Sequence, residues 1–300
     1  MCIDHLGQPT CELWSPNFRF PTALGLPTGG EPIPAWRLVP YDIADFDEWA
    51  YVRHDNVAAD PTRAKSLLYR ELSAAPTFFP VKIRFQGFVA AARLAALGNW
   101  NGAVGEAKSA RQDITLRCGD ATEDDGLWES TMRAVDNVKD YIYCVLGAPS
   151  KGRAGVSHLD RTVFAQRRVF TKVCVSSACR PLLRSTQVRS TNRNLPSALR
   201  EGDDPHGICE AVAKDWKVTS RLSIGRLAPS MVDDNRTVVC DHTAVKTGDF
   251  VDIGVSVEIV TFGRFDEKPR VDVHFCLEHV LLLRSADVEV CQITHFLHIH

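Results

Sequence analysis

The sequence predicts an α+β protein with a helical N-terminal unit and a small C-terminal β domain. Apolar residues recur at helical spacing between 60 and 147. Two later runs, 251–259 and 271–277, alternate apolar and polar residues, as strands with one buried face do. The 300 residues suffice for one large or two ordinary domains. We expect four consecutive parts: a proline-rich arm (1–59), a helical unit (60–150), a basic connector (151–200) and a β-rich domain (201–300).

The proline-rich arm is predicted to be extended. Prolines recur from Pro16 to Pro40, and proline fixes φ and lacks an amide donor. The rings of Trp14, Phe18 and Trp36 are too apolar for a free linker, so we expect the arm to bury them against a core. The first residues lack the charged start and apolar run of a secretory signal, which makes secretion by that route unexpected.

The helical unit is predicted to hold four helices, in the ranges 60–75, 80–98, 103–116 and 123–147. The last has the strongest signal. Acidic residues at 123–125 match the positive end of its dipole, and an apolar stripe runs from Leu127 to Val145. A further short helix is predicted at 206–216, with Asp204 as its N-cap.

The β-rich domain is predicted to centre on a long antiparallel hairpin at 249–284, after short strands at 218–224 and 237–240. The alternation changes phase near Glu278 and His279, which indicates a β-bulge. Asp252 and His274 fall on the face expected to be solvated. Because bulged, curved strands are what small barrels use, a partly open, five-stranded barrel of the oligonucleotide-binding (OB) type is the predicted architecture.

The basic connector carries the main functional signal. Between 151 and 193 basic residues greatly outnumber a single acid, Asp160. The rings of Phe164 and Phe170 lie among them, and cations with rings suit single-stranded nucleic acid. The candidate phosphate-binding residues are Arg161, Arg167, Arg168, Lys172, Arg180, Arg184, Arg189 and Arg193. The alternative interpretation is a solvated linker balanced by the acidic remainder of the chain.

The sequence offers no catalytic or metal-binding motif. The ten cysteines are dispersed without C-x-x-C spacing, and no nucleophile, base and orienting group can be named together. No stretch approaches the roughly 20 apolar residues that span a bilayer. We therefore expect no cofactor, no metal and no membrane. The first hypothesis is a non-enzymatic protein that binds single-stranded nucleic acid. The second is a protein-interaction module whose partner covers the hairpin edge or the aromatic arm, and an enzyme comes third.

Three segments carry a resemblance to other proteins: 195–208, Asp233-Asp234-Asn235-Arg236, and 247–253 with its Gly248-Asp249-Phe250-Val251-Asp252 run. Together with the apolar ending at 278–283, they resemble an uncharacterised group of proteins from mushroom-forming fungi. The resemblance is confined to about 195–284 and implies no activity. It implies a cytoplasmic or nuclear fungal protein.

Overall fold

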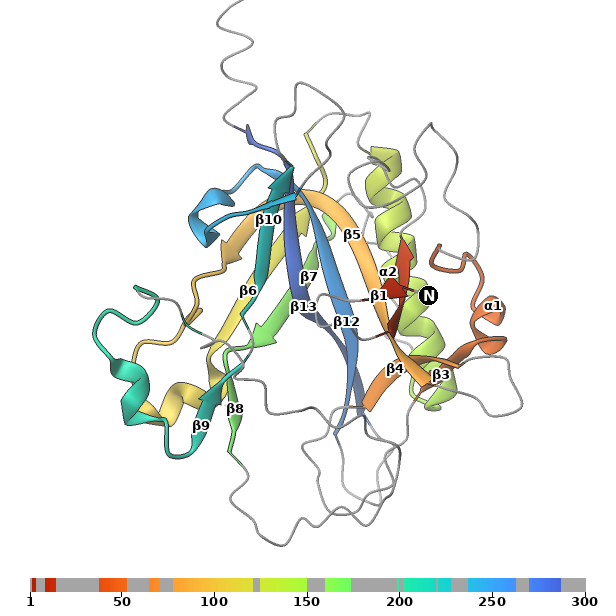
Figure 1. Ribbon diagram of the computed structural model, residues 1–300. Coiled ribbons are helices and arrows are strands. Elements are labelled where there is room, and N and C mark those ends of the chain that lie inside the picture. Colours follow the sequence, from red (N-terminus) through yellow and green to blue (C-terminus); the bar gives the residue numbers. More distant parts are fainter. Residues whose placement is uncertain are drawn as a thin grey trace, which may run out of the picture. The chain divides into compact units, whose positions relative to one another are not determined.

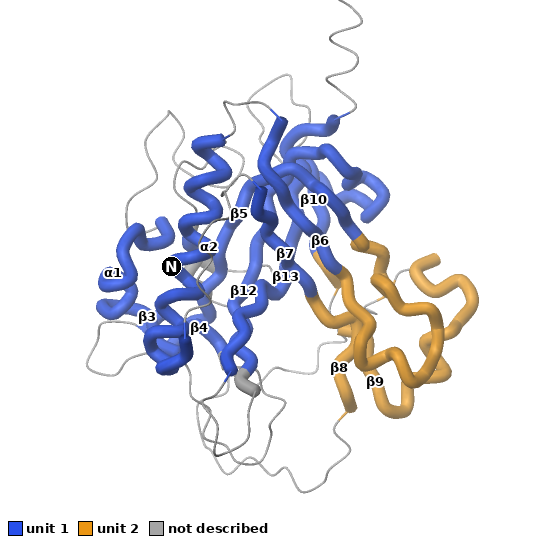
Figure 2. The backbone as a smooth tube through the Cα atoms, turned by 180° about the vertical axis from the view of Figure 1, so that it is seen from behind, with its two compact units in different colours: residues 1–92, 113–166, 223–300 blue, residues 93–112, 167–222 orange. Residues whose placement is uncertain are grey.

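The computed structural model describes residues 2–3, 9–14, 38–52, 65–70, 78–120, 125–149, 160–173, 199, 202–219, 221–227, 237–262 and 270–286. The described chain is mostly β-sheet with few helices (Figure 1). It forms two compact units (Figure 2): unit 1 comprises 1–92, 113–166 and 223–300, and unit 2 comprises 93–112 and 167–222. None of the described helices is long and apolar enough to cross a membrane.

Five strands close into a ring that lies largely in unit 1. They are β5 (Phe78–Arg93), β6 (Arg111–Arg117), β7 (Val163–Arg168), β12 (Phe250–Phe262) and β13 (Arg270–Arg284). Their order is β5-β6-β7-β13-β12, and β12 pairs with β5 to complete the circle. β12 is antiparallel to both β13 and β5, whereas β7 and β13 are parallel.

The inside of the ring is apolar. On β5, Val81, Ile83 and Phe85 are fully buried at every second position, so one face of the strand points inward. The ring of Phe85 meets that of Phe275 edge-on, with centroids 5.3 Å apart. These residues come from strands that are not neighbours in the ring, so their contact shows that side chains fill its interior.

Shorter strands extend the ring. β4 (Lys65–Arg70) pairs with β5 and with β12, bridging the ends where those two strands separate. β3 (Ala50–Val52) pairs with β4, and β2 (Pro9–Trp14) runs parallel to β5 and pairs with β1 (Cys2–Ile3). On the other side, β10 (Ser223–Leu227) runs parallel to β13 and pairs with β11 (Thr237–Val239). A 3-10 turn, η7 (His242–Ala244), precedes β12.

The long helix α2 (Asp125–Val145) packs against the ring through its apolar face. Gly87 occupies an inward position on β5, and a Cβ there would lie 2.7 Å from the ring of Trp128. The absent side chain therefore makes room for the indole. Near the other end, Tyr141 stacks on Phe46 of the short helix α1 (Ala44–Asp47), with centroids 4.9 Å apart.

Unit 2 is small and has its own core. It contains the 3-10 helices η3 (Val104–Ser109) and η6 (Ile208–Ala211) and an antiparallel pair, β8 (Phe170–Lys172) with β9 (Trp216–Val218). Its buried core residues are Trp100, Ala107, Ala110, Val169, Phe170 and Val212. The indole of Trp100 meets Phe170 edge-on at 4.8 Å.

The side chain of Asp204 bonds to the start of η6, but the N-cap residue is Gly207 and not Asp204 as predicted. Its carboxylate oxygens accept hydrogen bonds from the amides of Ile208 and Cys209, each at 2.9 Å. Burial opposes ionisation of Asp204, but the hydrogen bonds from Cys209 and Ile208 outweigh it and lower its pKa. The same neighbourhood raises the pKa of the Cys209 thiol to about 12, chiefly through burial and then through the adjacent carboxylate. The helix is shorter than the 206–216 predicted, because β9 begins at Trp216.

The predicted helical unit is wrong in three of its four helices. The range 60–75 contains β4, 80–98 contains β5, and 103–116 contains η3 and much of β6. In β5 the alternation of Phe79, Val81, Ile83 and Phe85 was outweighed by the alanines that follow, which favour helix intrinsically. Tertiary pairing on both edges of the strand decides its state. The fourth helix is confirmed as α2.

The predicted hairpin is confirmed as β12 and β13. Gly254 pairs with His279 and Val255 with Leu277, which leaves Glu278 as the extra residue of the predicted bulge. A five-stranded ring is present, but only these two of its strands come from the predicted β-rich domain. The other three come from chain segments predicted to be helices or connector. The two units likewise join separated segments, whereas the prediction divided the chain into consecutive parts.

One prediction about the hairpin surface is wrong. Asp252 is fully buried and paired with Arg84, whose Nε donates to Oδ1 at 2.7 Å, so it does not face solvent. Much of the edge of the hairpin is also covered, because β12 pairs with β5 over 250–256 and β13 pairs with β7 at 275–276 and with β10 over 279–282. Alternation assigns residues to faces, but it cannot tell which face or edge other segments cover.

Candidate nucleic-acid interface

The outer face of β6 and β7 presents an aromatic side chain to solvent. Ile114 and Leu116 on β6 point inward and are fully buried. On β7, Val163 and Ala165 are buried, while Phe164 between them is 43% exposed. The two strands are neighbours in the sheet, so the outward side chains of both strands form one surface.

Beside β13, the outward side chains of this surface make polar contacts with one another. Gln166 projects outward from β7, two residues beyond Phe164, and its Nε2 lies 3.3 Å from Nδ1 of His274 on β13. The other nitrogen of that imidazole lies 3.4 Å from Oδ2 of Asp272. His274 therefore lies on the outer face, as predicted, and contacts two polar side chains there.

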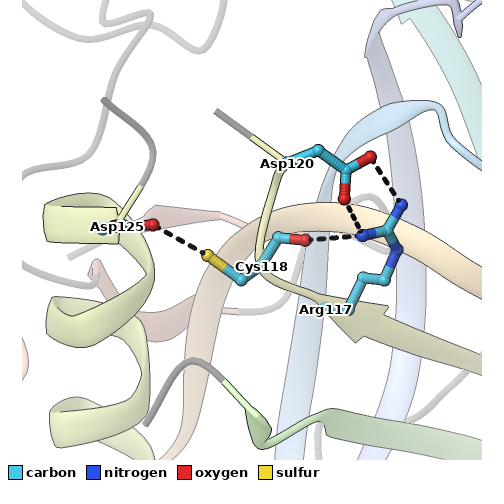
Figure 3. Close-up of polar contacts among 4 residues, drawn as sticks. All are labelled: Arg117, Cys118, Asp120 and Asp125. Atoms are coloured by element: carbon cyan, nitrogen blue, oxygen red, sulfur yellow. Dashed lines mark hydrogen bonds and ion pairs between the residues drawn. The ribbon is translucent and has the colours of Figure 1, made fainter. Parts of the chain in front are cut away.

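Arg117 lies at the end of β6, and its guanidinium is held by three oxygens (Figure 3). Nη1 donates to Oδ1 of Asp120 at 2.5 Å and Nη2 donates to Oδ2 at 3.2 Å. Nη1 also lies 3.3 Å from the carbonyl oxygen of Cys118. The hydrogen bond and the charge of Arg117 lower the pKa of Asp120, so this carboxyl stays ionised at neutral pH.

Cys118 links the end of β6 to α2. Its thiol donates to Oδ1 of Asp125, the first residue of the helix, across 3.7 Å (Figure 3). The thiol is buried and faces away from Arg117 in this view. This contact fixes the backbone whose carbonyl holds the guanidinium.

Arg161 is largely buried and forms an ion pair with Asp136. Its side chain is 8% exposed, and both terminal nitrogens donate to the carboxylate of Asp136 on α2. The charge that the sequence assigned to phosphate binding is thus neutralised within unit 1. Phe170 is also withdrawn from any stacking role, because it is buried in the core of unit 2.

Three of the predicted cations lie in described parts of unit 2. Arg167 and Arg168 end β7, and Lys172 ends β8. Arg168 and Lys172 are exposed, and the hydroxyl of Thr219 donates to the carbonyl oxygen of Arg168 at 2.8 Å. Lys172 pairs directly with the half-buried Trp216 across the β8–β9 ladder. The other predicted residues, Arg180, Arg184, Arg189 and Arg193, lie outside the described residues.

The two units differ in charge. Among the described residues of unit 2, lysines and arginines outnumber carboxylates, whereas in unit 1 carboxylates outnumber lysines and arginines. Within the described ranges no three His, Cys, Asp or Glu side chains gather as metal ligands do. The excess of cations in unit 2 suits an anionic ligand.

Sequence reasoning missed the outward residues of β6, because it assigned the range 103–116 to a helix. Arg117 and Thr115 alternate with the apolar Ile114 and Leu116, and this short period-two run was the available signal. Four residues of alternation are too few to outweigh helical spacing over the longer window.

Comparison with known proteins identifies no family. No family model matches the chain, and no curated protein matches it. Among solved structures it is similar to gp2.5, a single-stranded DNA-binding protein encoded by bacteriophage T7, with a TM-score of 0.27 and 11% identity. The match covers 68% of this chain and 92% of that chain. A likeness this low carries no argument about this chain.

Proposed function

We propose that this protein binds single-stranded nucleic acid on the outer face of β6 and β7. The ring has five strands, and the third and fifth along the chain, β7 and β13, are parallel. This is the arrangement of an OB barrel, whose second and third strands present the oligonucleotide-binding face. In this chain those strands are β6 and β7.

The observation that carries the proposal is the exposure of Phe164 on that face. A phenylalanine 43% exposed on a strand is available to a nucleobase, and stacking on an aromatic ring tolerates any base. The cost of removing such a ring is about 1–3 kcal/mol per stacked base. Fold alone does not establish function, so the proposal depends on this side chain rather than on the barrel.

Phosphate contacts are proposed from unit 2. Arg167, Arg168 and Lys172 supply cations in its described part, and Arg180, Arg184, Arg189 and Arg193 are proposed as further contacts. Lysine and arginine neutralise phosphates and release counterions, which makes binding salt-dependent. An enzyme is not proposed, because the described residues offer no nucleophile with a base and an orienting group.

The test compares Phe164→Ala with Phe78→Ala in fluorescence polarisation with a labelled oligothymidylate across a salt series. Both rings are 43% exposed, so the second variant controls for the loss of a surface phenylalanine. We expect Phe164→Ala to weaken binding about 5- to 150-fold, corresponding to one stacked base. Phe78→Ala should bind like the unmodified protein. Absence of salt-sensitive binding at micromolar protein, or equal losses in both variants, would contradict the proposal.

One observation favours a second candidate function, the binding of a protein partner. On β11, Val238 and Val239 are 43% and 65% exposed, and within the described chain this strand pairs only with β10. An exposed, β-branched edge strand can accept an added strand from a partner. Indifference to the oligonucleotide together with a co-purifying protein would favour this function over the first.

A further inference from the structure

Arg117 holds its guanidinium in a geometry that suits a phosphodiester, although Asp120 fills it in the structure (Figure 3). The side chain projects from the outer face of β6, whose inward neighbours are Leu116 and Ile114. Two of its N–H groups point at the two oxygens of one carboxylate. A phosphate can present two oxygens to the same two N–H groups. Arginine therefore binds carboxylates and phosphates alike through two parallel hydrogen bonds.

We propose that the guanidinium of Arg117 is a binding site for one phosphodiester group. In the free protein the carboxylate of Asp120 occupies this site, so Asp120 sets the affinity for nucleic acid. This inference rests on the proposed function, since it assigns a phosphate contact to the same face that carries Phe164. It adds residues that lie outside the basic connector.

The pair can open readily because it is solvated. The side chain of Arg117 is 38% exposed and that of Asp120 is 84% exposed. Ion pairs in water are weak, since screening reduces the attraction and two side chains must be ordered. A phosphate can therefore replace Asp120 without uncovering a buried charge.

The guanidinium has a second acceptor besides Asp120. The carbonyl oxygen of Cys118 accepts from Nη1, and the Cys118 thiol is itself bonded to Asp125. One anchor of Arg117 is thus independent of Asp120. Loss of the Asp120 carboxylate should therefore leave Nη1 and Nη2 of Arg117 available as donors to a phosphate.

Asp120 also opposes the ligand by its charge. Its depressed pKa keeps it ionised at neutral pH, and Arg117 is the cause of that depression. When a phosphate binds Arg117, the carboxylate of Asp120 remains beside the phosphate without its cation. The chain therefore carries a built-in competitor that favours release over very tight binding.

The experiment measures binding of fluorescein-labelled oligothymidylate by Asp120→Asn, Arg117→Gln and the double variant in a salt series. We expect Asp120→Asn to bind three- to tenfold more tightly, with a salt slope steeper by about 0.7, the value for one added phosphate contact on a single strand. Arg117→Gln should bind no more tightly than the unmodified protein. In the Arg117→Gln background Asp120→Asn should gain clearly less, because only the repulsion by the Asp120 charge remains there and no guanidinium is released for phosphate.

The matched control is Glu129→Gln, which removes one negative charge from another exposed pair, Glu129 with Arg133 on α2. If Asp120→Asn gains no more affinity than Glu129→Gln, or keeps its full gain in the Arg117→Gln background, the proposal for Arg117 is overturned while the proposed function stands. If the unmodified protein and all variants fail to bind, both proposals fall. Thermal unfolding of each variant confirms that folding is unchanged.

Discussion

Arg84 and Asp252 form a buried ion pair on the outer side of β5 and β12. Their side chains are 7% and 0% exposed. Nε and Nη2 of Arg84 donate to the two carboxylate oxygens at 2.7 and 2.5 Å. Removing two charges from water is costly, and only good geometry offsets that cost. The pair therefore contributes less to net stability than its short distances suggest, but neither partner can be lost alone.

Arg84→Met should destabilise the protein by about 3–5 kcal/mol, because it leaves the carboxylate of Asp252 buried without its cation. Urea denaturation should show this as a lower midpoint. The control is Lys82→Met, whose partner Glu278 and whose own side chain are more exposed, at 23% and 12%. Lys82→Met should lower the free energy of unfolding clearly less than Arg84→Met does.

A paired replacement, Arg84→Met with Asp252→Leu, should recover most of the loss, since no buried charge then remains. Equal losses in Arg84→Met and Lys82→Met would show that Asp252 is not isolated from water.

The Gly248-Asp249-Phe250-Val251-Asp252 run lies where β12 begins. Gly248 has φ of +91°, which an L side chain rarely adopts. The buried carboxylate of Asp249 accepts from the amides of Lys246 and Ala286, at 2.7 and 2.9 Å. It thereby ties the start of β12 to the end of β13.

The bulge in β13 places the imidazole of His279 directly against Gly254 of β12. Gly254 on β12 pairs with His279, and a Cβ added to this glycine would lie 2.0 Å from Cε1 of the imidazole. Without the extra residue Glu278, the apolar residues after it would turn to the other face. The glycine therefore permits the bulge to place His279 against β12 and Val280 in the core.

Gly254→Ala should destabilise the protein by about 1–3 kcal/mol, the usual cost of forcing extra atoms into a packed site. In a His279→Ala background the same substitution should cost much less, because the imidazole that fills the space is gone. Thermal unfolding of the four proteins gives the coupling as a double-mutant cycle. Additive losses would mean that the imidazole moves aside freely and does not fix this part of the hairpin.

The hairpin and α2 could be predicted because their signals are long and local. Apolar and polar residues alternate over 251–259 in β12, and the apolar stripe of α2 runs from Leu127 to Tyr143. β4 and β6, with six and seven residues, offer too few periods, and β5 owes its state to partners more than 150 residues away, as in the pairing of Arg84 with Gly254. The aromatic residue of the candidate site, Phe164, was recognised from its basic neighbours, whereas Arg117 depended on the unrecognised strand.

At the scale of the whole molecule, charge is divided between the units. Cations exceed carboxylates among the described residues of unit 2, and the opposite holds for unit 1. A net charge of −2 conceals this division. Because phosphate binding depends on local cations and not on the chain average, the net acidity of the chain does not argue against nucleic acid.

Arg168→Gln and Lys172→Gln should each weaken oligothymidylate binding uniformly across base sequences. Each should also reduce the magnitude of the salt slope by about 0.7, as expected when one phosphate contact on a single strand is lost. Both side chains are exposed, so their replacement should not affect thermal unfolding. The control is Arg226→Gln, an exposed cation of β10 in unit 1. If all three variants change the slope equally, binding follows net charge alone and unit 2 has no special part in it. If only the first two change it, the basic unit supplies the phosphate contacts.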